Sequence, residues 1–148
     1  MAEFTHFKKD GSAVMVDVHE KPDTYRAASA TGTIQVSPEV FAAVRDHTAK
    51  KGDVLGVARL AGIMGAKKNA ELIPLCHIVP LTNCEVTFTT DENTNSITAV
   101  CTTSCVGKTG VEMEALTGVS TVLLTIYDMC KAMDRGMVIR DIHILEKD

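Results

Sequence analysis

The chain has 148 residues, a net charge of −4 at pH 7, 45% hydrophobic residues and only 4% aromatic residues. This length suits a single domain over residues 1–148 with an aliphatic core, and the acidic balance argues against nucleic-acid binding, which needs a basic surface. No apolar run reaches the roughly 20 residues of a membrane helix, so we expect no membrane partner, and the N-terminal residues contain no apolar signal region.

The N-terminal part of the chain is polar and rich in turn-forming residues. Residues 1–13 are expected to form a flexible arm that leads into a short apolar stretch at 14–18. Residues 26–36 alternate small and polar side chains and end on Ile34-Gln35-Val36, which predicts a strand. The helix predicted next begins at Ser37-Pro38-Glu39, with Ser37 as the cap.

A second helix is predicted after the chain break at Lys51-Gly52-Asp53. Its large and small apolar residues fall on one face: Val54, Val57, Leu60, Ala61 and Met64. The same helix contains Gly56, Gly62 and Gly65, each of which costs about 1 kcal/mol relative to alanine. Because glycines allow close packing, we expect another helix to approach closely at these positions, which would offset their cost.

Two strands are predicted over residues 83–90 and 96–105, as a hairpin with its turn at 91–95. A long helix is predicted from about residue 111 to Arg135, where Gly136 ends it, and a final strand over 137–145. The order of elements predicts an α+β fold. It is the ferredoxin-like split βαβ arrangement, an antiparallel sheet with helices packed on one face and one extra helix after the first strand.

The long helix has an apolar stripe at spacings of three and four residues, formed by Val111, Ala115, Val119, Val122, Ile126, Met129 and Met133. Leu123, Leu124 and Tyr127 widen the apolar surface beyond that stripe. A helix that is apolar over much of its circumference is buried on more than one side. We therefore expect an oligomer, with Asp128 and Lys131 near a subunit interface or pocket.

Four charged residues on this helix each admit two interpretations. Asp128 and Lys131 form either an exposed i,i+3 ion pair or part of a functional site on an apolar face. Glu112 and Glu114 lie in the first turn, where carboxylates complement the helix dipole. Alternatively, they accept hydrogen bonds from the amino and ring N–H groups of a ligand.

Gly107-Lys108-Thr109 matches the end of a phosphate-binding P-loop. That loop needs a glycine five residues before Gly107, but Thr102 stands there in a β-branched run, so we reject this interpretation. Lys108 is either a solvated loop lysine or a phosphate contact beside the helix N-terminus.

The loop around His77 is apolar and bounded by two prolines, and a lone histidine in such surroundings is more often a core residue than a catalyst. Cys76 and His77 are adjacent, which cannot form a metal site, and no other pattern completes one, so we expect no bound metal. Five cysteines, an odd number in apolar surroundings, favour reduced thiols and a cytoplasmic location.

Taken together, five stretches resemble the molybdenum cofactor biosynthesis protein C family, the cyclic pyranopterin monophosphate synthases. The stretches are Met-Val-Asp-Val at 15–18, Ala-Gly-Ile-Met-Gly-Ala-Lys at 61–67, Ile-Pro-Leu-Cys-His at 73–77, Gly-Lys-Thr-Gly-Val-Glu-Met-Glu-Ala-Leu-Thr at 107–117 and Thr-Ile-Tyr-Asp-Met-Cys-Lys-Ala at 125–132. They occur in order over nearly the whole chain.

The resemblance implies a homohexamer, a trimer of dimers with active sites at the dimer interface, and no organic cofactor. The implied substrate is (8S)-3′,8-cyclo-7,8-dihydroguanosine 5′-triphosphate, made by a radical SAM GTP cyclase as functional partner. The implied products are cyclic pyranopterin monophosphate and pyrophosphate. A non-catalytic oligomer that binds pterins or nucleotides is the alternative.

The resemblance also implies roles for particular residues. Asp128, Lys131, Lys51 and His77 match catalytic positions, and residue types of this kind suit repeated proton transfers near neutral pH. The substrate-binding positions are Leu75, Cys76, His77, Glu112, Met113 and Glu114, with Arg26 and Lys147 as basic residues near the phosphates. Because the cationic residues are distant in sequence, only the folded protein could bring them together.

Overall fold

The computed structural model describes residues 11–147, except for the side chain of Lys147. Most of the arm predicted for residues 1–13, namely residues 1–10, lies outside the described residues. The elements in chain order are β1 (Thr24–Gln35), α1 (Pro38–Arg45), α2 (Val54–Lys67), α3 (Asn69–Leu72), β2 (Asn83–Asp91), β3 (Ser96–Gly107), α4 (Glu112–Cys130) and β4 (Val138–Lys147).

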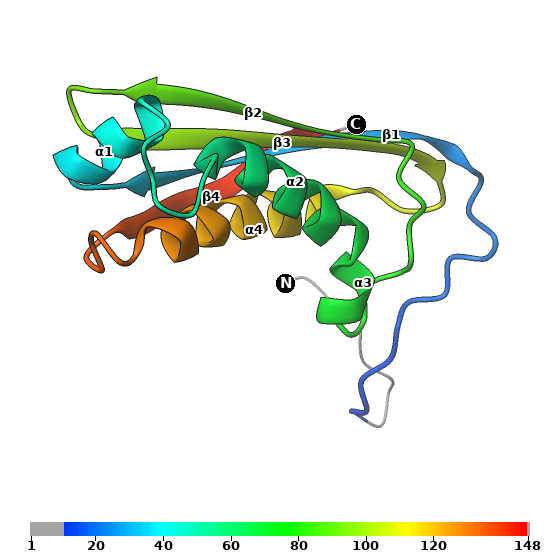
Figure 1. Ribbon diagram of the computed structural model, residues 1–148. Coiled ribbons are helices and arrows are strands. Elements are labelled where there is room, and N and C mark those ends of the chain that lie inside the picture. The colour runs from blue at the N-terminus through cyan, green and yellow to red at the C-terminus, as the bar shows by residue number, and fades with distance from the viewer. Residues whose placement is uncertain (1–10, 148) are drawn as a thin grey trace.

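The four strands form one sheet in the order β2-β3-β1-β4, and all three neighbouring pairs are antiparallel. Helices α2 and α4 lie side by side against the same face of this sheet (Figure 1). The strand order and the position of the helices confirm the predicted ferredoxin-like α+β fold. The short helix α3 was not predicted. None of the helices in residues 11–147 is long and apolar enough to cross a membrane.

The predicted starts of α1 and α2 are confirmed by their caps. The hydroxyl of Ser37 accepts a hydrogen bond from the backbone N–H of Val40 at 3.1 Å, and Pro38 occupies the first turn of α1. At α2 the carboxylate of Asp53 accepts from the N–H of Gly56, also at 3.1 Å. Each cap satisfies an N–H group that the first helical turn leaves without a backbone partner.

Helix α2 packs on α4 through small residues: its buried positions are Val54, Ala58, Gly62, Gly65 and Ala66. A Cβ atom added at Gly62 would lie 2.4 Å from a methyl carbon of Val122, and one at Gly65 would lie 2.4 Å from the hydroxyl of Thr121. The expected close helix approach is thus confirmed. The larger apolar residues of α2, Val57, Leu60 and Met64, point outward and are 45%, 59% and 48% exposed.

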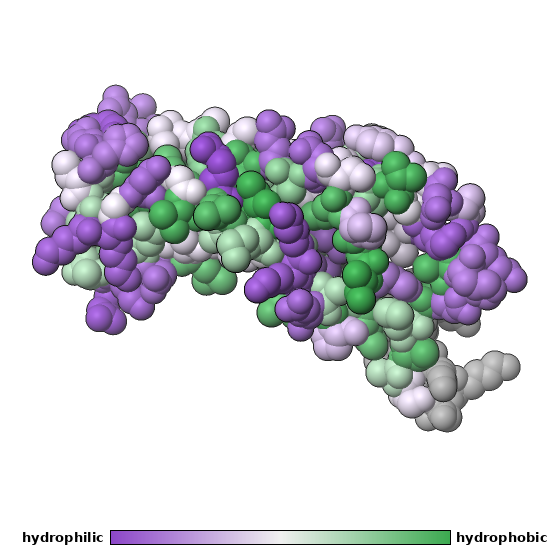
Figure 2. All heavy atoms as spheres, turned by 45° about the vertical axis from the view of Figure 1, so that its right-hand side comes forward, coloured by the Kyte–Doolittle hydropathy of each residue, from purple (hydrophilic) through white to green (hydrophobic). Residues whose placement is uncertain are grey.

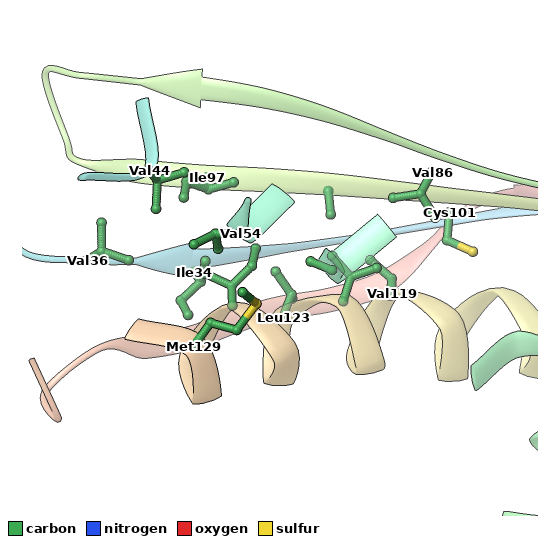
Figure 3. Packing of buried hydrophobic residues seen from close by; sticks show 14 of the residues in the cluster. Ile34, Val36, Val44, Val54, Val86, Ile97, Cys101, Val119, Leu123 and Met129 are labelled. Atoms are coloured by element: carbon green, nitrogen blue, oxygen red, sulfur yellow. The ribbon is translucent and has the colours of Figure 1, made fainter. Parts of the chain in front are cut away.

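The hydrophobic core lies between the sheet and the helices (Figure 3). The stripe predicted on α4 is buried along the helix, from Val111 at 0% exposed to Met129 at 9%. The predicted end of this helix is wrong, because α4 ends at Cys130 rather than Arg135. There the carbonyl of Cys130 accepts from the N–H groups of Met133 and Asp134, in a turn that directs the chain into β4.

Candidate functional site

Lys51, Asp128 and Lys131 meet at the C-terminal end of α4. One carboxylate oxygen of Asp128 lies 2.9 Å from Nζ of Lys131, and the other lies 3.6 Å from Nζ of Lys51. Lys51 also donates a hydrogen bond of 3.1 Å to the backbone carbonyl of Asp128. Lys51 comes from the loop before α2, so the fold brings together three residues that the sequence analysis assigned to catalysis.

This cluster is open to solvent, with the side chains of Lys51, Asp128 and Lys131 50%, 60% and 44% exposed. Ion pairs in such surroundings contribute little to stability. The hydrogen bond and charge of Lys131, assisted by Lys51, hold the pKa of Asp128 below its usual range. The carboxylate is therefore ionised near neutral pH, and it pairs with the side-chain amino groups of both lysines. Two cationic groups held in this way can bind phosphate oxygens and transfer protons.

A second group of predicted residues gathers at the N-terminal end of α4. A pocket of about 200 Å³ lies between the loop after α3 and the first turn of the helix. Its lining contains every predicted substrate contact from these two segments, Leu75, Cys76, His77, Glu112, Met113 and Glu114, together with Val79, Thr109 and Gly110.

Glu114 is buried within this group, at 4% exposed. The side-chain amide of Asn69, the first residue of α3, donates a hydrogen bond of 3.2 Å to the carboxylate of Glu114. The same amide accepts a hydrogen bond of 2.6 Å from the hydroxyl of Thr117. Burial raises the pKa of Glu114, and the charge of Glu112 raises it further, whereas the hydrogen bond from Asn69 lowers it. The sequence analysis missed Asn69, because an asparagine just after a helix is typical of a simple C-terminal cap.

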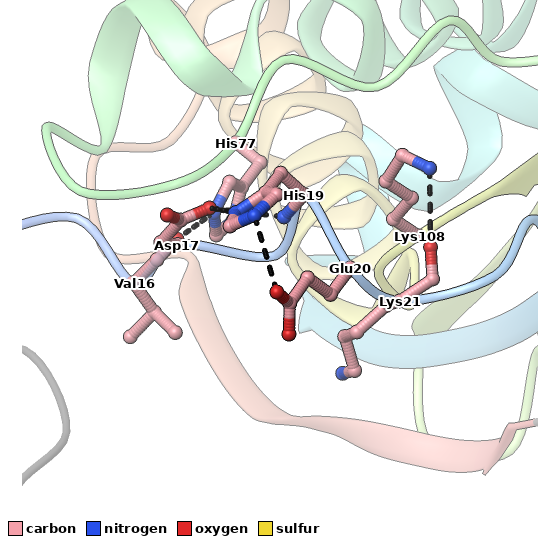
Figure 4. Close-up of polar contacts among 7 residues, drawn as sticks. All are labelled: Val16, Asp17, His19, Glu20, Lys21, His77 and Lys108. Atoms are coloured by element: carbon pink, nitrogen blue, oxygen red, sulfur yellow. Dashed lines mark hydrogen bonds and ion pairs between the residues drawn. The ribbon is translucent and has the colours of Figure 1, made fainter.

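His77 is held by the segment that precedes β1. Its Nε2 hydrogen-bonds the backbone carbonyl of Val16, as Figure 4 shows. Since a carbonyl can only accept, Nε2 carries the hydrogen in this contact, and Nδ1 is the ring nitrogen that can meet a ligand, as an acceptor in the neutral ring or as a donor in the protonated ring. Lys108 attaches the same segment further along, through the carbonyl of Lys21 at 3.1 Å and the carboxylate of Asp23 at 3.4 Å.

A larger pocket of about 700 Å³ lies between residues 15–23, the His77 loop and residues 106–109. It shares Cys76, His77, Val79 and Thr109 with the smaller pocket, so the two are neighbouring parts of one depression. The P-loop interpretation stays rejected: Thr102 is a β3 residue paired with Ser29, and Lys108 is one wall of this pocket.

Arg26 and Lys147 belong to strands that reach the same end of the sheet. Arg26 pairs with Cys105 of β3, and its Nε is buried without a hydrogen-bond partner among the residues that the structure describes. Burial raises the pKa of the Cys105 thiol, the charge of Glu114 raises it further, and the charge of Arg26 lowers it. Lys147 pairs through its backbone with Ala28, but its side chain lies outside the described part of the chain.

The two groups do not meet within one chain. Asp128 lies fourteen positions after Glu114 on α4, which is about 21 Å at the helical rise of 1.5 Å per residue. Proton transfer needs groups within about 3 Å of the reacting atoms, so one chain cannot apply both groups to the same atoms of a small substrate. Within residues 11–147, no three His, Cys, Asp or Glu side chains are gathered as a metal site requires.

Comparison with known proteins identifies the family of this chain. Residues 15–148 match the model of the MoaC family. A cyclic pyranopterin monophosphate synthase from Clostridium botulinum (strain Alaska E43 / Type E3) is 54% identical over 145 residues, which cover 98% of this chain and 91% of that protein. The chain therefore belongs to the MoaC family.

Proposed function

We propose that this chain is a cyclic pyranopterin monophosphate synthase that acts in molybdenum cofactor biosynthesis. It converts (8S)-3′,8-cyclo-7,8-dihydroguanosine 5′-triphosphate to cyclic pyranopterin monophosphate and releases pyrophosphate. The observation that carries the proposal is the cluster in which Lys51 and Lys131 contact the single carboxylate of Asp128. Membership of the MoaC family and the printed name of the relative from Clostridium botulinum support it.

The residues at the two ends of α4 suit different parts of this substrate. Glu112 and Glu114 are acceptors, and they fit the amino and ring N–H groups of a guanine-derived ring. His77 and Arg26 are cations or hydrogen-bond donors that suit the triphosphate, and we place Lys147 with them from its position in β4. Leu75, Cys76 and Met113 supply apolar walls.

The lysine cluster performs the chemistry in this proposal. Opening and rebuilding the purine ring requires repeated proton transfers, for which Lys51 and Lys131 act as acid or base groups oriented by Asp128. Closing the cyclic phosphate expels pyrophosphate, and fixed positive charge stabilises that leaving group. The ionised carboxylate of Asp128 keeps both lysine side chains in position through these steps.

We further propose that each active site is shared by two subunits of a homohexamer, a trimer of dimers. A two-fold pair presents the same surface from both chains. Antiparallel pairing of the outer faces of α4 would therefore bring the Glu114 end of one chain to the Asp128 end of its partner, twice per dimer. Leu124 lies between these ends, 61% exposed, as an apolar contact for such a pairing.

Apolar surface elsewhere supports further subunit contacts. Val57, Leu60 and Met64 form an exposed apolar line on α2, at spacings of three and four residues. Figure 2 shows apolar side chains in two areas of one face of the molecule, on either side of a column of polar side chains, with further polar side chains toward the two ends. Exposed apolar patches rimmed by polar residues are typical of protein interfaces.

The substrate is already a cyclised and reduced nucleotide, so another enzyme must supply it. We propose a radical SAM GTP cyclase as that functional partner. A cytoplasmic location fits the five cysteines, all of which are free thiols.

The competing function is a non-catalytic oligomer that binds the nucleotide. Purified protein is incubated with the cyclic dihydroguanosine triphosphate, and pyrophosphate and pterin products are measured for the wild type, Lys131→Ala and Lys51→Ala. We expect both variants to lose about 10²- to 10⁴-fold in rate, the usual contribution of a general acid or base. Lys50→Ala is the matched control, because Lys50 is the exposed neighbour of Lys51 and should keep full activity.

Two results would overturn the assignment. Folded wild-type protein that releases no pyrophosphate would show that the chain is not this synthase. A Lys131→Ala variant that keeps its rate but binds substrate more weakly would overturn the catalytic role of Lys131 and leave it as a substrate-binding residue.

A further inference from the structure

Two cysteines face each other on neighbouring strands, away from both pockets described above. In the β2–β3 register Cys84 pairs with Thr103 and Val86 pairs with Cys101, so the two cysteines are diagonal neighbours on one face of the sheet. Their Sγ atoms lie 3.8 Å apart. Both side chains are free thiols.

The two thiols differ in their surroundings. Cys101 is 0% exposed and points toward the helix layer (Figure 3), where a Cβ atom added at Gly118 of α4 would lie 2.7 Å from its sulfur. Cys84 is only partly buried and lines a separate pocket of about 290 Å³, together with Ile63, Lys67, Leu81, Thr82 and Asn83. Small reagents can therefore reach Cys84 but not Cys101.

The neighbours of Cys84 favour its thiolate form. A hydrogen bond with the Cys101 thiol lowers the pKa of Cys84. Burial raises this pKa, and the charge of Lys67 lowers it further. Burial raises the pKa of Cys130 and of Cys105, which keeps both of those thiols protonated. The thiolate is the form that reacts with oxidants.

We propose that Cys84 and Cys101 form a reversible peroxide-sensitive dithiol, with Cys84 as the reactive thiol and Cys101 as its resolving partner. The Cys84 thiolate attacks one oxygen of hydrogen peroxide, the O–O bond breaks, and the departing hydroxide takes up a proton to become water. The product is a sulfenic acid at Cys84.

The second step joins the two sulfurs. The hydrogen bond with Cys84 and burial raise the pKa of Cys101, so its thiol keeps its proton until it attacks Sγ of Cys84. In that step the S–O bond breaks, and the leaving hydroxyl takes the Cys101 proton and departs as a second water. Two thiols and one peroxide thus give one disulfide and two waters. The S–S distance shortens from 3.8 Å to about 2 Å, and a small thiol that enters the Cys84 pocket can reverse the bond by exchange.

The test treats the full-length protein with increasing hydrogen peroxide, blocks remaining thiols with N-ethylmaleimide and maps peptides by mass without reduction. We expect a peptide pair linked through Cys84 and Cys101 that disappears after dithiothreitol. In Cys101→Ala, dimedone should trap a sulfenic acid at Cys84. In Cys84→Ser, Cys101 should stay reduced.

A surface variant keeps the test decisive if changes at the buried Cys101 prevent folding. Lys67→Gln should slow the oxidation of Cys84 several-fold, whereas Lys68→Gln, a charge change at the next residue, should not. The proposal is overturned if Cys84 stays reduced at peroxide concentrations that oxidise Cys76, or if it links to a cysteine other than Cys101. Equal oxidation rates in Lys67→Gln and the wild type would remove Lys67 from the mechanism and contradict the proposal as stated.

Discussion

Two variants that are each inactive should restore activity when they share an oligomer. Lys131→Ala removes a group at the C-terminal end of α4, and Glu114→Gln removes one at the N-terminal end, about 21 Å away along the helix. If each site takes one end from each of two chains, a mixed dimer has one intact site and one site with both defects. We therefore expect co-expressed chains to regain activity that neither variant shows alone.

The size of the recovery follows from random assembly. At equal amounts of the two chains, half of the dimers are mixed and each holds one intact site of two, so about a quarter of all sites are active. The assay is the rate of pyrophosphate release per subunit, with differently tagged chains co-purified to confirm mixing. Lys131→Ala mixed with Asp128→Asn is the matched control and should regain nothing, because both changes affect the same end of α4.

A mixed oligomer of Lys131→Ala and Glu114→Gln that regains no activity would refute the shared site. So would recovery in the control mixture, because that result would show that Lys131 and Asp128 do not act in one cluster.

Three further predictions concern α2 and the buried network at Glu114. Gly62→Ala should lower the free energy of unfolding by about 1 kcal/mol and the melting temperature by about 2–4 °C at fixed subunit concentration. The reason is that crowding against Val122 (about 1–3 kcal/mol) exceeds the gain of about 1 kcal/mol in helix propensity. For Glu114→Gln, urea unfolding at a series of pH values should show a flatter pH dependence. Burial raises the pKa of Glu114, so the folded state binds its proton more tightly, and stability falls as pH rises from the ordinary glutamate pKa through the folded one. Asn69→Ala should cost about 1–3 kcal/mol in urea unfolding, because it leaves buried partners at Glu114 and Thr117 unsatisfied, and a carboxyl titration by NMR should place the pKa of Glu114 higher still.

Each of these predictions has an outcome that contradicts it. A more stable Gly62→Ala protein would mean that α2 can move away from α4 at little cost. If Glu114→Gln keeps the pH dependence of the wild type, another group controls it. An unchanged Glu114 pKa in Asn69→Ala would show that the hydrogen bond from Asn69 does not act on the charged form.

The order of helices and strands could be predicted from the sequence, because it depends on local physical chemistry. Ser37 and Asp53 can satisfy the N–H groups of a first helical turn, and the alternation in residues 83–105 suits a hairpin with one buried face. With strands and helices in that order, few compact antiparallel arrangements remain, and the observed sheet is the one expected. The resemblance carried by residues 107–117 and 125–132 depends equally on sequence alone.

Tertiary structure decided what local patterns could not. The end of α4 depends on where the chain must turn to place β4 beside β1, which no local residue signals, because residues 131–135 are compatible with a helix. Likewise, the buried face of α2 is the one with glycines, since closeness to α4 outweighed the larger side chains.

The same holds for the candidate site. Hydrogen bonds between residues far apart in the chain, such as Asn69 with Glu114 and Lys51 with Asp128, exist only after the helices pack. The sequence by itself therefore determined which residue types are present and in what order the helices and strands follow one another along the chain. Only the packed structure decided which of those residues meet, because side-chain contacts act over a few ångströms and depend on how the helices and strands are placed.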